Sequence, residues 1–343
     1  MTTNKELLTS SYDFTLPSEL IATHPASPRD SAKLLVYDRK KDLITHAIFS
    51  EFEDFIPKNC ALIFNDTKVI KARLFGYKIS GGKIELLINR ALNAYDINVY
   101  IRGKVKVGTE IIFSDDLIAK VTKLEDDGSR EVEFLECGKR LRFEDLLPII
   151  DKIGHVPLPP YIQRDDDKSD ESEYQSVFAR EEGAVAAPTA SLHFTPEQHK
   201  RVCDKFPHAY VTLHVGSGTF KPVEASTITD HPMHSEYYDI SPHAKELLGS
   251  DIPILSVGTT STRTVEYYAR NPHATKGEAN LFLHPNNTPL RVNHLLTNFH
   301  LPKSTLLMLV ASFVGVDKAQ ELYAEAIKEK YRFYSYGDAM LII

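Results

Sequence analysis

Two segments of the chain place glycine and hydroxyl residues directly after predicted strands. Residues 257–263 read Val-Gly-Thr-Thr-Ser-Thr-Arg, follow an apolar strand predicted over 252–257, and lead directly into a predicted helix over 261–270. A helix N-terminus offers unpaired N–H groups and positive potential, so this segment is suited to a phosphate or a carboxylate. The alternative is that Thr260 or Ser261 only caps the helix. The candidate binding residues of this segment are Thr259, Thr260, Ser261 and Arg263.

The second segment, 214–220, reads His-Val-Gly-Ser-Gly-Thr-Phe and ends a strand predicted over 208–215. Two glycines allow a ligand to approach the backbone closely. Lys221 stands where a dinucleotide fingerprint requires a third glycine, so the pattern is not that fingerprint, and a tight turn without a ligand is the alternative. The candidate binding residues here are Gly216, Ser217, Gly218 and Thr219.

A run of small residues over 183–191 ends in two further hydroxyl candidates, Thr189 and Ser191. Such a run favours either close packing of the chain against a neighbouring element or a flat surface on which a ring of a ligand can lie.

Several of the fourteen histidines lie near these segments. In an extended chain, His234 and Glu236 share one face, so the carboxylate is expected to orient the imidazole as a general base. His214 is the other candidate base, and His300 and His193 follow it. Structural histidines are one alternative and a metal site is another, although no H-E-x-x-H spacing occurs, nor a Walker A loop or a G-x-S-x-G elbow.

Basic residues are concentrated in one stretch although the chain as a whole has a net charge of −7. Residues 68–106 contain nine Lys or Arg and two Glu or Asp. A solvated face is the simpler interpretation, and contact with a nucleic-acid backbone is the functional one. The candidate RNA-binding residues are Lys68, Lys71, Arg73, Arg102 and Lys104. The compensating acidic run over 165–173 predicts an exposed, mobile loop.

The predicted elements that position these residues follow two different sequence patterns. Residues 74–148 alternate β-branched and polar residues between turn signals, which predicts a small antiparallel barrel or sandwich. On either side, strands and helices alternate, which predicts an α/β fold. We therefore expect an α/β catalytic domain over 1–73 and 149–343 with a β-barrel domain inserted at 74–148. The predicted helices include 304–314 and 317–331, and the predicted strands include 34–37, 61–64, 290–296 and 338–343.

The length of 343 residues and a 42% apolar composition indicate a globular protein of about two domains. No secretory signal or membrane-spanning run is readable, so a cytoplasmic location is expected. Three cysteines, Cys60, Cys137 and Cys203, are far apart and are expected to be buried small hydrophobes.

Nine blocks of residues, in order along the chain, resemble the S-adenosylmethionine:tRNA ribosyltransferase-isomerases of queuosine biosynthesis. These blocks are 64–67, 72–76, 154–162, 183–194, 211–223, 234–237, 257–266, 297–302 and 331–340. Residues 281–287 depart from the family at a turn where Pro-Gly is expected. Asn65, Asp66 and Asn298 lie within the blocks and join the candidate substrate-binding residues.

The resemblance implies an α/β domain with an inserted small β-barrel. It also implies transfer of the ribosyl moiety of S-adenosylmethionine to 7-aminomethyl-7-deazaguanine at the tRNA wobble position, giving epoxyqueuosine and releasing adenine and methionine. S-adenosylmethionine is then a consumed co-substrate, and no metal, permanently bound cofactor, membrane or obligate protein partner is implied. A histidine-metal hydrolase acting on a nucleotide and a non-catalytic RNA-binding module are the alternative functions.

Overall fold

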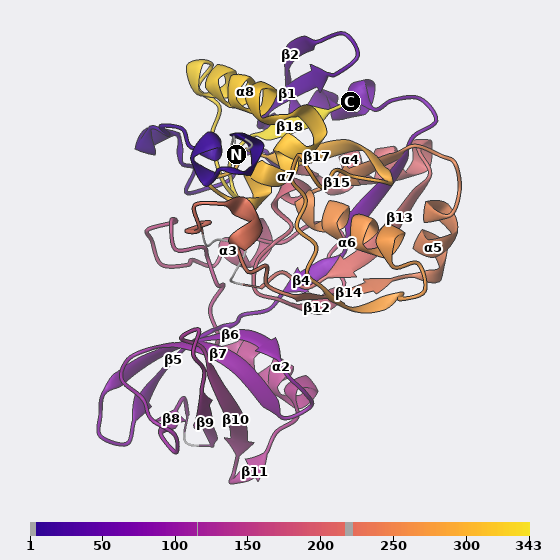
Figure 1. Ribbon diagram of the computed structural model, residues 1–343. Coiled ribbons are helices and arrows are strands. Elements are labelled where there is room, and N and C mark those ends of the chain that lie inside the picture. Colours follow the sequence, from indigo (N-terminus) through magenta and orange to yellow (C-terminus); the bar gives the residue numbers. More distant parts are fainter. Residues whose placement is uncertain (1–4, 115, 217–221) are drawn as a thin grey trace. The chain divides into compact units, whose positions relative to one another are not determined.

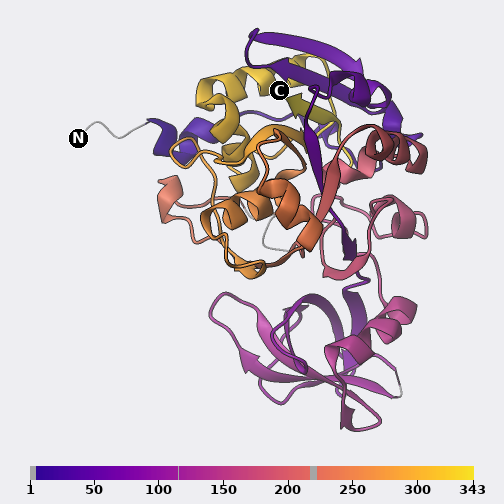
Figure 2. The same ribbon diagram turned by 90° about the vertical axis from the view of Figure 1, so that its right-hand side faces the viewer.

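The structure is a computed structural model that describes residues 5–114, 116–216 and 222–343 (Figure 1, Figure 2). Contacts within the chain divide it into two compact units. The α/β unit comprises Met1–Thr67, Gln175–Glu181 and Ala187–Ile343, and the barrel unit comprises Lys68–Tyr174 and Glu182–Ala186. That 74–148 is an inserted domain with boundaries at those residues stays a prediction.

A nine-stranded mixed sheet forms the centre of the α/β unit, with the strand order β16-β14-β13-β3-β15-β17-β18-β1-β2. Its neighbours β13, β3, β15 and β17 are all parallel to one another. The carboxyl ends of these four strands therefore lie at the same edge of the sheet, which is where open α/β sheets bind ligands. The strands are β1 (Lys33–Asp38), β2 (Leu43–Ile48), β3 (Ala61–Asn65), β13 (His208–Leu213), β14 (Glu236–Ile240), β15 (Ile254–Val257), β16 (Lys276–Ala279), β17 (Val292–Asn298) and β18 (Ala339–Ile342).

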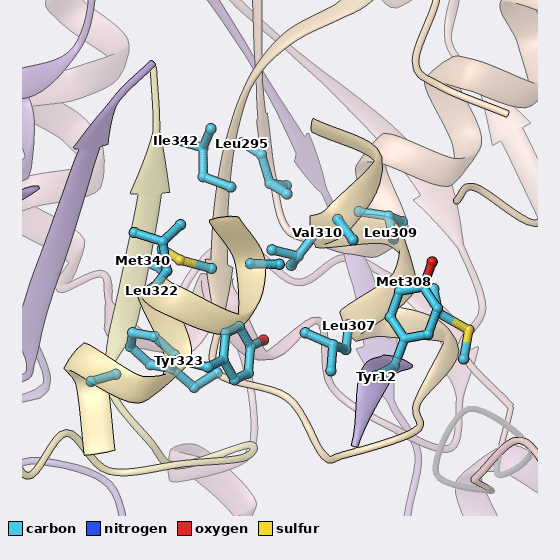
Figure 3. Packing of buried hydrophobic residues seen from close by; sticks show 14 of the residues in the cluster. Tyr12, Leu295, Leu307, Met308, Leu309, Val310, Leu322, Tyr323, Met340 and Ile342 are labelled. Carbon is cyan, nitrogen blue, oxygen red and sulfur yellow. The ribbon is translucent and has the colours of Figure 1, made fainter. Parts of the chain in front are cut away.

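Both faces of the sheet are buried at β17 and β18, because alternate residues of these strands enter different apolar clusters. Leu295 of β17 and Met340 of β18 belong to the cluster that packs against α7 and α8 (Figure 3). Their neighbours Leu296 and Leu341 belong to a second cluster, which contains Phe64 and residues around α4. The helices are α1 (Phe52–Phe55), α4 (Pro196–Lys205), α5 (Pro242–Leu248), α6 (Thr259–Arg270), α7 (Thr305–Val314) and α8 (Val316–Lys328).

Hydroxyl caps begin three of these helices. The side chains of Thr195, Ser241 and Ser304 each accept a hydrogen bond from the backbone N–H three residues later. In the first two helices a proline occupies the first position, where its missing N–H costs no hydrogen bond. These caps fix where α4, α5 and α7 begin.

The barrel unit is a closed antiparallel barrel, because β10 pairs with β9 as well as with β7 and so joins the two ends of the sheet (Figure 1). The predicted fold class, an α/β core with a small antiparallel β-barrel, is confirmed. The strands are β5 (Arg73–Lys78), β6 (Lys83–Ala91), β7 (Asp96–Arg102), β8 (Glu110–Ile112), β9 (Leu117–Leu124), β10 (Arg130–Glu136) and β11 (Lys139–Arg140), and the unit also contains α2 (Phe143–Ile153) and α3 (Asp170–Glu173). A separate two-stranded sheet pairs β4 (Thr67–Val69) with β12 (Glu181–Ala184).

Most of the acidic run over 165–173 is exposed, as its composition predicts, but the run is not a loop throughout. It contains the short helix α3, and Asp170 is buried. Its two carboxylate oxygens accept hydrogen bonds of 2.6 and 2.7 Å from the guanidinium of Arg164. A buried carboxylate needs such a partner, and composition alone does not show which arginine supplies it.

Two further expectations need adjustment. Cys60 is buried as predicted, but Cys137 is exposed and Cys203 is partly exposed. The strand predicted over 290–296 is β17 (Val292–Asn298), which begins and ends two residues later.

Among the described residues, no helix has the length and apolarity needed to cross a membrane.

Candidate functional site

Asn65 connects two strand ends and a helix start at the carboxyl edge of the sheet. Its side-chain nitrogen donates to the carbonyl of Leu213 and to the hydroxyl of Thr260, both at 3.1 Å. Its side-chain oxygen accepts from the backbone N–H groups of Leu213 and Thr67. The side chain is fully buried. These hydrogen bonds fix the ends of β3 and β13 against the start of α6. We call the polar residues around this point the strand-end cluster: Asn65, Thr67, His214, Gly216, Glu236, Thr260 and Arg263.

His214 follows β13 and is partly exposed. Its Nδ1 lies 2.8 Å from the hydroxyl of Thr67, and its ring stacks on Tyr237 with centroids 5.6 Å apart. Burial lowers the pKa of His214, and the nearby Asp66 carboxylate opposes that shift. The imidazole is therefore neutral near pH 7. Within the described residues its Nε2 has no hydrogen-bond partner.

Asp66 is next to Asn65 but is fully engaged with protein groups. One oxygen accepts from the hydroxyl of Thr212 at 2.7 Å, and the other accepts from the Arg180 guanidinium at 2.6 Å. The sequence did not single out Arg180, which lies 114 residues away and follows no recognisable motif. Asp66 therefore positions the end of β3, and its predicted contact with substrate stays a prediction.

Glu236 and Arg263 form a buried ion pair between the start of β14 and the first turns of α6. Glu236 is 6% exposed and Arg263 is 5% exposed. The second carboxylate oxygen of Glu236 accepts from the backbone N–H of Gly216 at 3.0 Å. The Nε of Arg263 donates to the carbonyl of Leu281, while its buried Nη2 has no partner in the described part of the chain.

His234 lies outside this arrangement. It is exposed, whereas Glu236 is buried and directed to Arg263. The regular two-residue alternation that placed both side chains on one face begins only at Glu236, where β14 starts. The structure thus gives Glu236 a different partner from the predicted one, and His234 as a catalytic residue stays a prediction.

The start of α6 is capped by neither hydroxyl that the sequence suggested. Its N-cap is Gly258, at a φ of +94°, a backbone conformation that glycine adopts without strain. The hydroxyls of Ser261 and Thr262 donate back to the carbonyls of Val257 and Gly258. Thr260 instead directs its oxygen to Asn65. Ser217, Gly218 and Thr219, the candidates of the neighbouring glycine segment, lie outside the described residues.

His193, Asn298 and His300 gather at the end of β17. His193 Nε2 lies 3.3 Å from the side-chain oxygen of Asn298, and His300 Nε2 lies 2.8 Å from the hydroxyl of Thr297. Burial lowers the pKa of His193 to about 4 and that of His300 to about 3. Both imidazoles are neutral at pH 7 and bonded to protein groups. Nearby, Thr189 and Ser191 lie in one 3₁₀ turn, and the buried Ser191 hydroxyl has no partner among the described residues.

These two buried histidines make stability depend on pH. Their folded-state pKa values lie below the ordinary value of about 6.5, so the unfolded chain binds more protons below that pH and stability falls as the pH falls. We expect each histidine to lower the free energy of unfolding by about 1.4 kcal/mol for every unit that the pH falls between about 6.5 and its own folded-state pKa. Urea unfolding at a series of pH values measures this slope. A His300→Gln variant should show a shallower acid slope, and an unchanged slope would contradict the assignment.

The candidate RNA-binding residues of the barrel unit differ in how far their charges are exposed to solvent. Lys71 contacts Glu171 at 3.1 Å, and Arg73 contacts Glu85 at 2.8 Å. Lys68 pairs with Glu182 at 2.7 Å. Arg102 has an 85% exposed side chain, and Lys104 is exposed. Arg102 also contacts the Glu85 carboxylate at 3.3 Å, but its side chain stays exposed, so Arg102 and Lys104 present their charges to solvent. The other three are less exposed and are held by carboxylates.

Within the described residues, no group of three or more His, Cys, Asp or Glu side chains is arranged to hold a metal ion.

Comparison with known proteins identifies the family of the chain. A family described as "Queuosine biosynthesis protein" matches residues 9–342. The chain is 75% identical over 340 residues, 99% of both chains, to the S-adenosylmethionine:tRNA ribosyltransferase-isomerase of Sulfurimonas denitrificans. It is 55% identical over 343 residues to the enzyme of the same name from Campylobacter jejuni, covering 99% of this chain and all of that one.

A crystal structure of S-adenosylmethionine tRNA ribosyltransferase from Thermotoga maritima is similar to this one, with a TM-score of 0.53 and 33% sequence identity. The match covers 97% of this chain and 100% of that one. The chain belongs to the queuosine biosynthesis protein family. The family resemblance predicted from the sequence is thus confirmed, and the chain is an enzyme.

Proposed function

We propose that this enzyme is an S-adenosylmethionine:tRNA ribosyltransferase-isomerase. It transfers the ribosyl moiety of S-adenosylmethionine to 7-aminomethyl-7-deazaguanine at the tRNA wobble position and releases adenine and methionine. The observation that carries the proposal is 75% identity over 99% of both chains to a relative of that name. The comparisons favour this activity over a histidine-metal hydrolase. S-adenosylmethionine is then a consumed co-substrate, and tRNA is the partner.

The reaction needs a base beside the sulfonium, a neutral attacking amine and an acid for the departing adenine. We assign the base to His214. Its lowered pKa keeps the ring neutral at pH 7, and its Nδ1 is held by Thr67. When Nδ1 carries the proton and donates it to the Thr67 hydroxyl, the lone pair is on Nε2, the nitrogen without a partner in the described residues. The sulfonium already activates the donor, so the proposed reaction needs no metal.

The donor's polar ends are assigned to the rest of the strand-end cluster. S-adenosylmethionine carries a carboxylate, and the unpartnered Nη2 of Arg263 is a buried cationic donor suited to it. The hydroxyl of Thr260 accepts from Asn65, so its own proton is left to donate to a ligand. Ser217 and Thr219 remain proposed contacts of the same donor.

Replacing Thr260 by Val tests the donor site. Loss of one hydrogen bond of ordinary strength should raise the KM for S-adenosylmethionine by about five- to tenfold, while the affinity for tRNA stays unchanged. Thr260→Ser keeps the hydroxyl and is the matched control, with a KM close to that of the unaltered enzyme. Equal KM values for Thr260→Val and the unaltered enzyme would remove Thr260 from the donor site.

Release of adenine tests the proposed function itself. Purified enzyme is incubated with S-adenosylmethionine and with tRNA that carries 7-aminomethyl-7-deazaguanine, and adenine is separated by chromatography. We expect adenine only when both substrates are present. Adenine release that is independent of tRNA, or no release with both substrates, would contradict the proposal.

A further inference from the structure

Three strands of the barrel unit present an unusual outer face. Residues of β5, β6 and β7 alternate between the barrel interior and solvent, as strands do. Leu74, Leu86 and Val99 point inward and are buried in the barrel core. Phe75 and Tyr77 of β5 point outward instead, with 46% and 54% of their surfaces exposed. Phe75 meets the edge of the His155 ring, with centroids 5.0 Å apart, yet about half of its surface stays open to solvent, as does that of Tyr77.

Cations surround these two rings. The strand register places Phe75 opposite Glu85, which in turn lies opposite Arg102, and it places Tyr77 opposite Lys83. The guanidinium of Arg73 lies over the ring of Phe75, 4.9 Å from its centroid. Lys83 and Arg102 are both exposed.

Glu85 does not cancel this charge. Its carboxylate accepts from Arg73 at 2.8 Å and from Arg102 at 3.3 Å. Asp165 also approaches Arg73, at 4.0 Å. The three cations Arg73, Lys83 and Arg102 still outnumber these two carboxylates, so the face carries a net positive charge. The Glu85 carboxylate also holds the two guanidinium groups beside the rings.

Exposed rings with neighbouring cations are the chemistry that binds unpaired nucleotides. Bases stack on aromatic rings and on guanidinium planes, while Lys and Arg contact phosphates. Phe75 and Tyr77 are two residues apart on one strand, a separation of about 6 to 7 Å, so neighbouring bases of one strand can reach both rings. A double helix keeps its bases stacked inside and does not offer them to such a surface.

We propose that the outer face of β5, β6 and β7 docks the unpaired bases of an RNA loop, which stack on Phe75 and Tyr77 while Lys83 and Arg102 contact its phosphates. We call this face the stacking face. The inference rests on the proposed function, because tRNA is the substrate that would bring an unpaired loop to this enzyme. It adds two aromatic residues that the charge pattern of the sequence did not reveal.

Binding of a labelled RNA hairpin that carries the anticodon loop, measured by fluorescence anisotropy, tests the stacking face on the full-length enzyme. We expect Phe75→Ala and Tyr77→Ala each to raise the Kd by about fivefold or more, and Tyr77→Phe to leave it nearly unchanged. Neither aromatic replacement should alter the dependence of Kd on salt. Arg102→Ala should instead reduce the salt slope, because it removes a phosphate contact.

Tyr95→Ala is the matched control. Tyr95 is an exposed aromatic residue of the same barrel with the Arg140 guanidinium 5.1 Å from its ring centroid, but it precedes β7 at the opposite end from Arg102. Its removal should leave the Kd unchanged. Equal losses from Tyr95→Ala and Tyr77→Ala, or no loss from either Phe75→Ala or Tyr77→Ala, would overturn the stacking face.

Two further readouts separate this inference from other outcomes. Adenine release by the unaltered enzyme reports the proposed function, so a normal release with unchanged Kd values in the variants overturns the stacking face alone. Sedimentation of the same variants reports self-association. A change in oligomeric state without a change in RNA affinity would show that the face contacts a second copy of the chain, and would also overturn RNA docking.

Discussion

His214→Asn is expected to lower the rate of adenine release by about 100- to 10,000-fold, the usual contribution of a positioned general base. Asn keeps a polar atom near the position of Nδ1, which contacts Thr67, but it has no nitrogen at the position of Nε2. The fold and the affinity for tRNA should therefore survive. Steady-state kinetics at saturating substrate, with circular dichroism as a check on folding, measures the loss.

The pH dependence of the unaltered enzyme gives an independent test of this role. Burial lowers the pKa of His214, so the base form persists below pH 6.5 and activity should fall only at a lower pH. Exchange of the donor's acidic C–H with deuterated solvent should vanish in His214→Asn and remain in His234→Asn. Exchange at the normal rate in His214→Asn would assign the base to another group.

Removal of Arg263 is expected to have a large effect on the stability of the α/β unit. Arg263→Met removes the guanidinium from the buried Glu236 carboxylate, and breaking a buried pair in this way costs about 3 to 5 kcal/mol. The free energy of unfolding from urea titration at neutral pH measures this change. The double variant Glu236→Leu with Arg263→Met should recover part of it, because no buried charge is left.

Arg263→Lys separates the structural role from the proposed binding role. The lysine keeps a positive charge near Glu236 but has no second terminal nitrogen in the place of Nη2. We expect a smaller loss of stability together with a clear rise in the KM for S-adenosylmethionine. A large stability loss with an unchanged KM would show that Arg263 supports the fold only.

The architecture was predictable because its signals are local. The alternation of β-branched residues after Leu74 predicted the barrel, and the helix predicted over 304–314 is α7, which begins at its Ser304 cap. Glycines and hydroxyls after strands predicted the edge of the sheet that carries the strand-end cluster. Parallel strands made this possible, since their carboxyl ends lie at one edge.

The partners of each side chain were not predictable in the same way. Glu236 pairs with Arg263, 27 residues away. His234 does not share its face, because β14 begins only at Glu236. Asp66 pairs with Arg180 across 114 residues, and no local pattern marks that contact. Charge counting also overstated the basic stretch, because Lys71 and Arg73 are held by carboxylates.

The exposure of Phe75 and Tyr77 could not be predicted from the sequence for a related reason. In the sequence, Phe75 and Tyr77 are ordinary members of an alternating strand, and alternation does not say which face of a barrel strand is covered. The closed barrel decides this, because it directs Leu74 and Gly76 inward. Addition of a Cβ at Gly76 would bring it within 2.7 Å of the carbonyl oxygen of Ile112, so the inward face at this position has no room for a larger residue.

The measurement that tests the account most directly is the fate of the donor's ribose. S-adenosylmethionine labelled in the ribose is incubated with the enzyme and with tRNA that carries 7-aminomethyl-7-deazaguanine, and the nucleosides of the recovered tRNA are analysed by mass spectrometry. The account predicts one labelled ribosyl unit on the wobble nucleoside, with the mass of epoxyqueuosine, for each adenine and each methionine released. An unlabelled wobble nucleoside, or label transferred without loss of adenine, would contradict it.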